Sequence, residues 1–477
     1  MNYLLFMPEF TLTALAFGVL AVDLFLPRDK KSYLPWLSLV GLAGVLALSL
    51  RYLWGKDTNL YDGLFLIDSF SLFFKGFFLV LGGLVVLSSV EYVRRHLSHP
   101  GEYYGILLFS ILAMMLMAAA GELLTAYISL ELLSFSLYVL VAHGRDTPRS
   151  NEASIKYILL GAFASALLLY GISQVYGMLG TTRFAEIHAA LLAQDTPLNP
   201  AVLVGLVLIV AGLGFKVAAV PFHMWAPDVY EGAPTPVTAY LAVGSKAAAF
   251  ALILRLFSQA FMPAIDDWQV ILVILAALTM TLGNLVAMVQ RNMKRLLAYS
   301  SIGHVGYLLL GVAALSPLAS DGVMLHLAGY GVTNLAAFLC VIMFYNMTGK
   351  DDIEDYAGLA DRAPFVAMAM AVALFSLAGL PFFAGFTTKF YLFTAAANEG
   401  LLWLVGIAIT NSLISLYYYM MVIKQMYMVP ASDSSPLRFS LVSSGVLGVL
   451  VLAIFLIGVY PGPLVEAIQG ATGAIFP

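Results

Sequence analysis

The sequence predicts an all-α polytopic membrane protein with about fourteen transmembrane helices. Hydrophobic residues make up 61% of the 477 residues and charged residues only 10%, whereas a soluble domain has about 25% charged residues. Apolar runs of about 20 residues, the length that crosses a bilayer, also follow one another along almost the whole chain. Too few charges remain to cover the surface of soluble domains.

The apolar runs between polar breaks define the predicted helices. The first run is not a cleavable signal, because it is too long, lacks a basic start and carries Glu9. The longest connection, about 180–199, contains RFAEIHAALLAQ, which fits an amphipathic helix on the membrane surface or an ordinary loop helix. The predicted spans are 3–26, 33–54, 66–93, 103–120, 122–142, 153–179, 200–222, 236–258, 267–289, 293–315, 322–347, 364–396, 401–427 and 438–461.

Basic residues predict the orientation of these helices. With the N-terminus outside, the cytoplasmic loops carry 14 Lys and Arg, and the outer loops with their flanks carry 4, including Arg255. Lys and Arg concentrate in cytoplasmic loops, so both termini are expected on the outer, periplasmic side. An even number of helices agrees with this arrangement.

Several classes of function are excluded by composition and motifs. The net charge of −4 gives no basic surface for nucleic acid. The single cysteine, Cys340, excludes an internal disulfide framework, a CxxC redox pair and a cysteine-ligated cluster. No P-loop, GxGxxG or HExxH motif occurs. We therefore expect this chain to bind no cofactor and no metal.

Five lysines fall inside the predicted spans. A charge at the bilayer centre costs about 2.5–3.5 kcal/mol on insertion scales, so such residues usually mark a function. Lys75 and Lys156 lie near helix ends, where a long side chain can instead extend to the membrane surface. Lys216, Lys246 and Lys389 lie deeper, and for them we expect a function.

Glu131 lies in the middle of the apolar run AYISLELLSFSLYVL. An isolated ionised carboxylate cannot be held there, so Glu131 is expected to be protonated or paired with a lysine. A fixed ion pair that joins two helices and a pair that opens and closes are both compatible with the sequence.

Two predicted spans contain interruptions, GFKVAAVPFHMW (214–225) and LAGLPFFAGFTTKF (377–390). Pro221 in the first, and Pro381 with Gly385 in the second, release backbone groups that need a polar cavity. Interruptions at matching positions, an odd number of helices apart, indicate an inverted-repeat transporter. Kinks from helix packing alone are the alternative.

Four stretches together resemble the antiporter-like membrane subunits of respiratory complex I, and most closely their N type. They span about 130 to 395, and their spacing follows the family throughout. The stretches are ELLSFSLYVL with EASIKYILLGAFASALLLYG, PFHMWAPDVYEGAPTPVTAYLAVGSKAAAF, GNLVAMVQRNMKRLLAYSSIGHVGYLL and LAGLPFFAGFTTKFYLF.

The resemblance implies a fold of two inverted five-helix repeats, in which helices 7 and 12 are discontinuous. The flanking helices 1–3 would occupy 1–102. The two repeats would occupy 103–258 and 259–427, and the last helix would lie in 428–477.

The resemblance also implies roles in proton translocation for Glu131 on the fifth helix, Lys216 on the broken seventh helix and Lys246 on the eighth. Lys389 matches the family's lysine on the broken twelfth helix, and Lys156 matches a lysine of the sixth helix in the N type. The M type and the related sodium/proton antiporter subunits usually have a glutamate where Lys389 stands.

Two histidines are secondary candidates for a proton relay. His304 lies in SSIGHVGY, where Ser300, Ser301 and Tyr307 could extend a proton wire, and His326 lies on the next helix. Histidine is a suitable shuttle near neutral pH, although a histidine in a span is often only a packed hydrogen-bonding residue.

The implied function is that of a proton-translocating subunit of an NADH:quinone oxidoreductase in the bacterial plasma membrane. This chain carries no redox centre, so the complex as a whole would supply NADH, FMN, iron–sulfur clusters and a quinone. Expected partners are the M-type and small membrane subunits and the lipid bilayer, but no nucleic acid. The alternatives are a sodium/proton antiporter subunit and a structural spacer that moves nothing.

Overall fold

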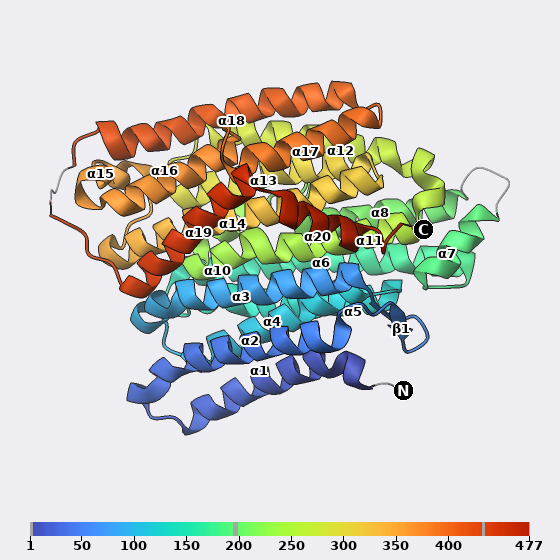
Figure 1. Cartoon of the computed structure of the whole chain (residues 1–477), viewed down its shortest axis with the longest axis horizontal. Helices are drawn as coiled ribbons and strands as arrows, with labels where there is room; N and C mark the ends of the chain where they lie inside the picture. The colour runs from blue at the N-terminus through green and yellow to red at the C-terminus, as the bar shows by residue number, and fades with distance from the viewer. Residues whose placement is uncertain (1–2, 194–198, 432–434, 477) are drawn as a thin grey trace.

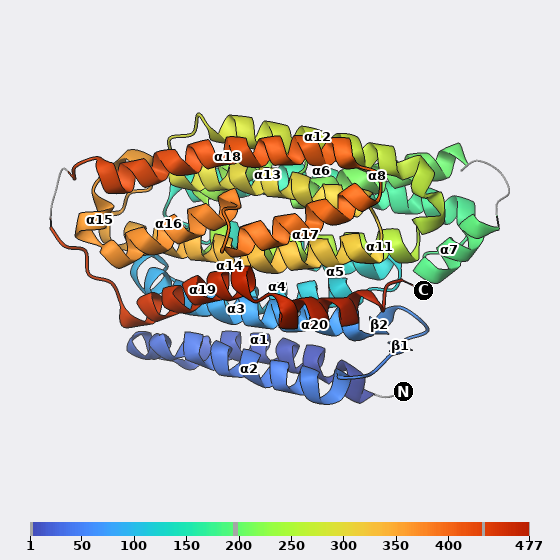
Figure 2. The same cartoon turned by 45° about the horizontal axis from the view of Figure 1, so that its top comes forward.

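Long apolar helices form because a bilayer offers no water to the backbone, so each N–H and C=O must be satisfied within the helix. The computed structural model describes residues 3–193, 199–431 and 435–476. Its helices lie side by side in one bundle (Figure 1), and both termini lie at the same end of that bundle (Figures 1 and 2). The all-α polytopic fold is confirmed.

The described residues contain thirteen helical segments long and apolar enough to cross a membrane. The remaining predicted span, 364–396, is divided into two short helices, α16 and α17. The helices are α1 (Met7–Phe25), α2 (Leu34–Leu53), α3 (Ser69–His96), α4 (Pro100–Ala119), α5 (Leu123–Val141), α6 (Pro148–Leu179), α7 (Phe184–Leu192), α8 (Pro200–Val217), α9 (Trp225–Gly232), α10 (Thr235–Tyr240), α11 (Lys246–Gln259), α12 (Ile265–Ala287), α13 (Met293–Ala313), α14 (Pro317–Thr348), α15 (Leu359–Arg362), α16 (Pro364–Ala378), α17 (Ala384–Asn398), α18 (Leu402–Met428), α19 (Leu441–Val459) and α20 (Gly462–Thr472).

Both predicted helix interruptions are present. The first separates α8 from α9, and Ala218 at its start has a left-handed φ of 62°. The second separates α16 from α17, where Gly379 and Phe382 have φ values of 89° and 72°. Left-handed residues end a helix because they turn its next carbonyls and amides out of the helical ladder.

The most buried helices lie in the middle of the bundle. In the apolar part of the segment Thr235–Gln259, 100% of the residues are buried. The corresponding share is 94% for Met293–Ala313 and for Pro317–Thr348. Both views show α13 and α14 inside the bundle, with α1 and α2 at one edge and α12 and α18 at the opposite edge (Figures 1 and 2). These central helices carry Lys246 and both candidate histidines.

Two local features, a hairpin and a π-helical turn, were not predicted from the sequence, whereas a short helix at RFAEIHAALLAQ was. A short antiparallel hairpin, β1 (Thr58–Leu60) and β2 (Phe65–Ile67), connects α2 to α3; its strands are too short to give an alternating pattern. The helix α7 occupies most of RFAEIHAALLAQ, while residues 194–198 of that connection lie outside the described residues. A π-helical turn, η3 (Leu241–Ser245), lies between α10 and α11.

The side chain of Arg255, a residue counted with the outer loops and their flanks in predicting the orientation, is completely buried. Its guanidinium forms a bidentate ion pair with Asp68, with N–O distances of 2.8 and 2.9 Å. Its Nε donates to the carbonyl of Ala118 at 3.0 Å. This clamp joins α11, α4 and the start of α3, and its planar donors match the carboxylate in a way that lysine cannot.

Candidate functional site

Lys216 lies at the end of α8, immediately before the first interruption, and its side chain is only 6% exposed. Its Nζ donates to Ser134 Oγ of α5 at 2.5 Å and lies over the rings of Tyr138 and Phe215. Trp225 Nε1, at the start of α9, donates to the Phe215 carbonyl at 2.9 Å. A side chain on α9 therefore satisfies a backbone group next to Lys216.

Glu131 is predicted to be protonated or paired with a lysine. In this structure, no ion pair within 4.0 Å joins it to Lys216 among the described residues. Glu131 is half-buried on α5 and accepts a hydrogen bond from Ser165 of α6 at 2.6 Å. Ser134 lies three residues after Glu131, which places both on one face of the helix, so the serine occupies the position nearest the lysine.

Lys246 is the first residue of α11, directly after the π-helical turn, and is 2% exposed. Its Nζ donates to Ser301 of α13, and it lies 5.7 Å above the ring of Tyr230. A π turn rotates the residues that follow it relative to a regular helix, and such turns occur frequently at functional sites.

A buried chain of polar groups continues from Ser301. Its hydroxyl shares a 2.6 Å hydrogen bond with Tyr330, whose ring lies 5.0 Å from that of His304. His304 Nδ1 lies 3.1 Å from His326 Nε2, and His326 Nδ1 lies 3.0 Å from Thr388 Oγ1. The structure thus joins both candidate histidines in one hydrogen-bonded chain over α13, α14 and α17.

Lys389 follows Thr388 and lies beside the second interruption, with 4% of its surface exposed. Its Nζ donates to the carbonyls of Leu377 and Ala378 at 2.9 and 3.2 Å and to Ser412 Oγ at 2.9 Å. A cavity of about 460 Å³ between α17 and α18 reaches this lysine and is lined mainly by apolar side chains. The ammonium therefore satisfies carbonyls at the end of α16 and also borders an open space.

Comparison with known proteins places this arrangement in a family. Residues 120–415 match the family described as "NADH:quinone oxidoreductase/Mrp antiporter, TM". The chain is 46% identical over 434 residues to a protein of Trichlorobacter lovleyi named NADH-quinone oxidoreductase subunit N, covering 91% of this chain and 89% of that protein. This chain belongs to the subunit N family. The resemblance found in the sequence is confirmed.

Solved structures agree with membership in the subunit N family. A chain of respiratory complex I from Thermus thermophilus with bound aureothin is 30% identical and has a TM-score of 0.81, covering 97% of this chain and 99% of its own length. A chain of the Mrp complex from Dietzia sp. DQ12-45-1b has a TM-score of 0.86 at 22% identity, covering 98% of this chain and 97% of its own length. At that identity the second likeness shows the fold alone.

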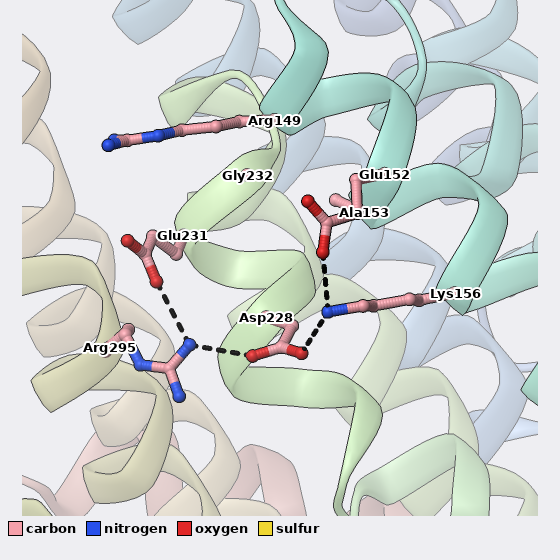
Figure 3. A pocket seen from close by; sticks show the side chains of 8 residues that line it. All are labelled: Arg149, Glu152, Ala153, Lys156, Asp228, Glu231, Gly232 and Arg295. Carbon is pink, nitrogen blue, oxygen red and sulfur yellow. Dashed lines mark hydrogen bonds and ion pairs between the residues drawn. The ribbon is translucent and has the colours of Figure 1, made fainter.

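In this member of the subunit N family, Lys156 reaches the surface. Its side chain is 43% exposed and pairs with Glu152 at 2.8 Å and with Asp228 of α9 at 2.7 Å. Figure 3 shows Lys156 pointing to Asp228 at the edge of a surface pocket of about 230 Å³. The structure therefore agrees with the alternative in which Lys156 extends to the membrane surface.

For Lys75 the same alternative is wrong. Its side chain is 0% exposed and forms a 2.7 Å ion pair with Glu9 of α1, which is 2% exposed. In the sequence, Glu9 argues only against a signal peptide, and its pairing with Lys75 was not predicted. An acidic residue in one apolar run and a lysine in another were the available signal, but nothing local shows that α1 and α3 bring them together.

No metal ligand set is formed by the part of the chain that the structure describes. Within residues 3–193, 199–431 and 435–476, no group of three or more His, Cys, Asp or Glu side chains could hold a metal ion. Cys340 is buried as a free thiol. The polar side chains that link Lys246, the two histidines and Thr388 are an ammonium, hydroxyls and imidazoles, which can exchange protons.

Proposed function

We propose that this chain is a proton-translocating membrane subunit of an NADH:quinone oxidoreductase, driven by quinone reduction elsewhere in the complex. The observation that carries the proposal is the set of partners around Lys216, Lys246 and Lys389. Each ammonium donates to neutral oxygens, and none of the described carboxylates lies within 4.0 Å of it. A buried lysine without a counter-charge is not fixed in its charged form, so it can load and release a proton.

The three lysines form the proposed route together with the polar chain between them. Lys216 would receive a proton under the influence of Glu131, which favours the charged lysine from a distance. Lys246 would pass it through Ser301 towards the histidines, and Lys389 would end the route. No hydrogen bond among the described residues joins Lys216 to Lys246, so transfer between them requires water or side-chain movement.

The proposed organisation assigns 103–258 and 259–427 to two inverted repeats, with 1–102 and 428–477 as flanking helices. It also places both termini on the outer side of a bacterial plasma membrane, as the distribution of basic residues indicates. Support for the repeats comes from Lys216 and Lys389, since each lies beside a helix interruption.

Partners in this proposal are the other membrane subunits of complex I. Glu131 shares its face of α5 with Ile128 and Phe135, both 59% exposed, so a neighbouring subunit or lipid covers that face. Iron–sulfur clusters would be bound by other subunits, because the described residues of this chain provide no ligand set for a cluster. The proposal places NADH, FMN and quinone on other subunits as well.

Replacing Lys246 tests the proposal in the intact complex. Lys246→Met keeps most of the side-chain volume but cannot carry a proton, so proton uptake per NADH oxidised in inverted membrane vesicles should be lost. The matched control is Lys56→Met, on an exposed loop. Normal pumping in an assembled Lys246→Met complex would overturn the proposed route, and pumping that required sodium would favour the antiporter alternative.

A further inference from the structure

A cluster of charged residues surrounds α9 on the surface of the bundle (Figure 3). Asp228 lies at its centre and accepts from two helices at once, from Lys156 of α6 at 2.7 Å and from Arg295 of α13 at 2.7 Å. The same Arg295 nitrogen also reaches Glu231, one turn further along α9, at 3.0 Å. α6 lies in the first proposed repeat and α13 in the second, so one carboxylate holds both.

A second contact reinforces the attachment of α9 to α13. Lys294, next to Arg295, donates to the main-chain carbonyl of Glu231 and forms an ion pair with Asp351 at 3.3 Å. Lys294 is 5% exposed, so this contact is more shielded from solvent than the pairs of Asp228. The helix α9 is thus fixed both by ion pairs of its side chains and by a hydrogen bond to its C-terminal backbone. A single surface ion pair would fix it much more weakly.

The helix α9 also contacts the residue next to Lys216 and lies against Lys246. Its Trp225 donates to the carbonyl of Phe215, the residue before Lys216, and stacks on Tyr157 with ring centroids 4.5 Å apart. Its Tyr230 presents the ring over which Lys246 lies. A shift of this eight-residue helix therefore moves the surroundings of Lys216 and of Lys246 together.

We infer that Asp228 is a positioning residue that fixes α9 between the two repeats and so sets the distance over which Lys216 and Lys246 exchange protons. This inference rests on the proposed function. Asp228 touches neither Lys216 nor Lys246, and it acts through the placement of Trp225 and Tyr230.

The charge state of Asp228 suits this role. Burial raises the pKa of its carboxyl, but the hydrogen bonds and charges of Lys156 and Arg295 outweigh that effect, so the pKa lies below its usual value. Because its pKa is lowered, the carboxyl of Asp228 is ionised at every pH above the ordinary aspartate pKa, near 3.9. It loses its ion pairs only when the pH falls below that value. The clamp is therefore present at neutral pH.

The test uses the assembled complex in inverted vesicles and compares four variants with the parent. Asp228→Asn removes the charge but keeps the shape, and we expect the protons taken up per NADH to fall at least about threefold while the amount of assembled complex is unchanged. Asp228→Glu should restore most of the ratio. Arg295→Gln should lose pumping in the same direction, and the double variant should lose less than the sum of the two single losses, because both changes break the shared contact between Asp228 and Arg295.

The matched control is Asp355→Asn, which removes the carboxylate of the ion pair with Lys350, whose side chain is 63% exposed. It should pump normally. Parent-like pumping by Asp228→Asn, or additive losses in the double variant, would overturn the positioning role. Lys246→Met is assayed in parallel to separate failure of the inference about Asp228 from failure of the proposed function. If only the inference about Asp228 is wrong, Lys246→Met still loses pumping. If the proposed function is wrong, Lys246→Met pumps normally.

Discussion

Buried lysines of this chain fall into two kinds according to the oxygen that each one meets. Lys75 pairs with the Glu9 carboxylate at 2.7 Å, whereas Lys216, Lys246 and Lys389 donate to hydroxyls or main-chain carbonyls. A carboxylate stabilises the ammonium and keeps it charged, while a neutral oxygen leaves both forms accessible. The partner, more than the depth of burial, separates a structural lysine from a proposed carrier.

Lys389→Arg separates a carrier from a structural donor at the second interruption. Arginine keeps a positive charge and several donors for the carbonyls at the end of α16, but it does not release its proton in proteins. We expect the variant complex to assemble and to lose coupled proton uptake, measured in proteoliposomes of the intact complex. A fully active Lys389→Arg complex would leave Lys389 with the purely structural role of satisfying freed carbonyls.

Glu131→Gln tests whether the carboxylate acts on Lys216 without touching it. Removing the negative charge makes the charged form of Lys216 less favourable, so loading of that lysine should fail and most quinone-coupled pumping should disappear. Assembly should survive, because Ser165 can still hydrogen-bond to glutamine. Glu399→Gln, at an exposed position after α17, is the control, and unchanged pumping by Glu131→Gln would contradict the proposed role.

The Glu9–Lys75 pair should affect stability and not transport. Glu9→Gln leaves a buried ammonium without its counter-charge, which costs about 3–5 kcal/mol. Less assembled complex should therefore survive a thermal ramp in detergent, while pumping by the surviving complex is normal. Adding Lys75→Met should recover the stability, since it removes the uncompensated charge; failure of that rescue, or loss of pumping at full assembly, would contradict this assignment.

At the scale of the element, the second interruption depends on a glycine that admits no side chain. A Cβ on Gly385 would lie 1.7 Å from the main-chain oxygen of Ser376. Gly385 also donates its backbone N–H to the Ser376 hydroxyl at 3.0 Å, which in turn bonds Thr333 of α14. The start of α17 is therefore seated directly against the last turn of α16.

Gly385→Ala should push α16 and α17 apart and move Lys389 away from its carbonyl partners. A clash with backbone typically costs at least about 1–3 kcal/mol, so we expect reduced thermal stability together with reduced pumping. Gly406→Ala in α18 is the matched control, because a Cβ there meets nothing within 4 Å. Equal behaviour of the two variants in a melting and pumping assay would show that the close seating is unnecessary.

The sequence predicts helix positions and interruptions where these depend on hydropathy and proline. The interruptions at Pro221 and Pro381 were predictable, because a proline within an apolar run cannot continue the helical ladder. The π turn before Lys246 was not, since nothing in LAVGS distinguishes it from an ordinary helical turn. The role of Ser134 was not predictable either. Its sequence position resembles that of any polar residue on a helix, and only the folded structure brings the Lys216 ammonium to its hydroxyl.

At the scale of the whole molecule, ion pairs between residues far apart in the sequence were not predicted. The buried pairs Glu9–Lys75 and Asp68–Arg255 each join helices that are far apart in sequence. Their partners depend on how the helices are arranged, which local periodicity does not contain. The central position of α13 and α14 is likewise a property of the bundle, although the motifs on these helices marked His304 and His326 as candidates.

The isolated chain should catalyse no NADH:quinone oxidation. Its described residues hold no metal ligand set, and the proposed function places the redox reaction on partner subunits. Purified protein in detergent, assayed with NADH and a soluble quinone, should show no activity above a no-protein blank, while the intact complex from the same membranes is active. Measurable oxidation by the isolated chain would contradict the assignment of redox chemistry to partner subunits.

The hydrogen-bonded chain from His304 through His326 to Thr388 has one further consequence. When a proton enters an imidazole at one ring nitrogen and another leaves from the second nitrogen, the ring is left with its hydrogen on the opposite side. A second proton cannot follow until both rings have turned back. In the proposed route this chain would pass one proton per reset, so its rate would be limited by the reorientation of buried side chains and not by the number of lysines.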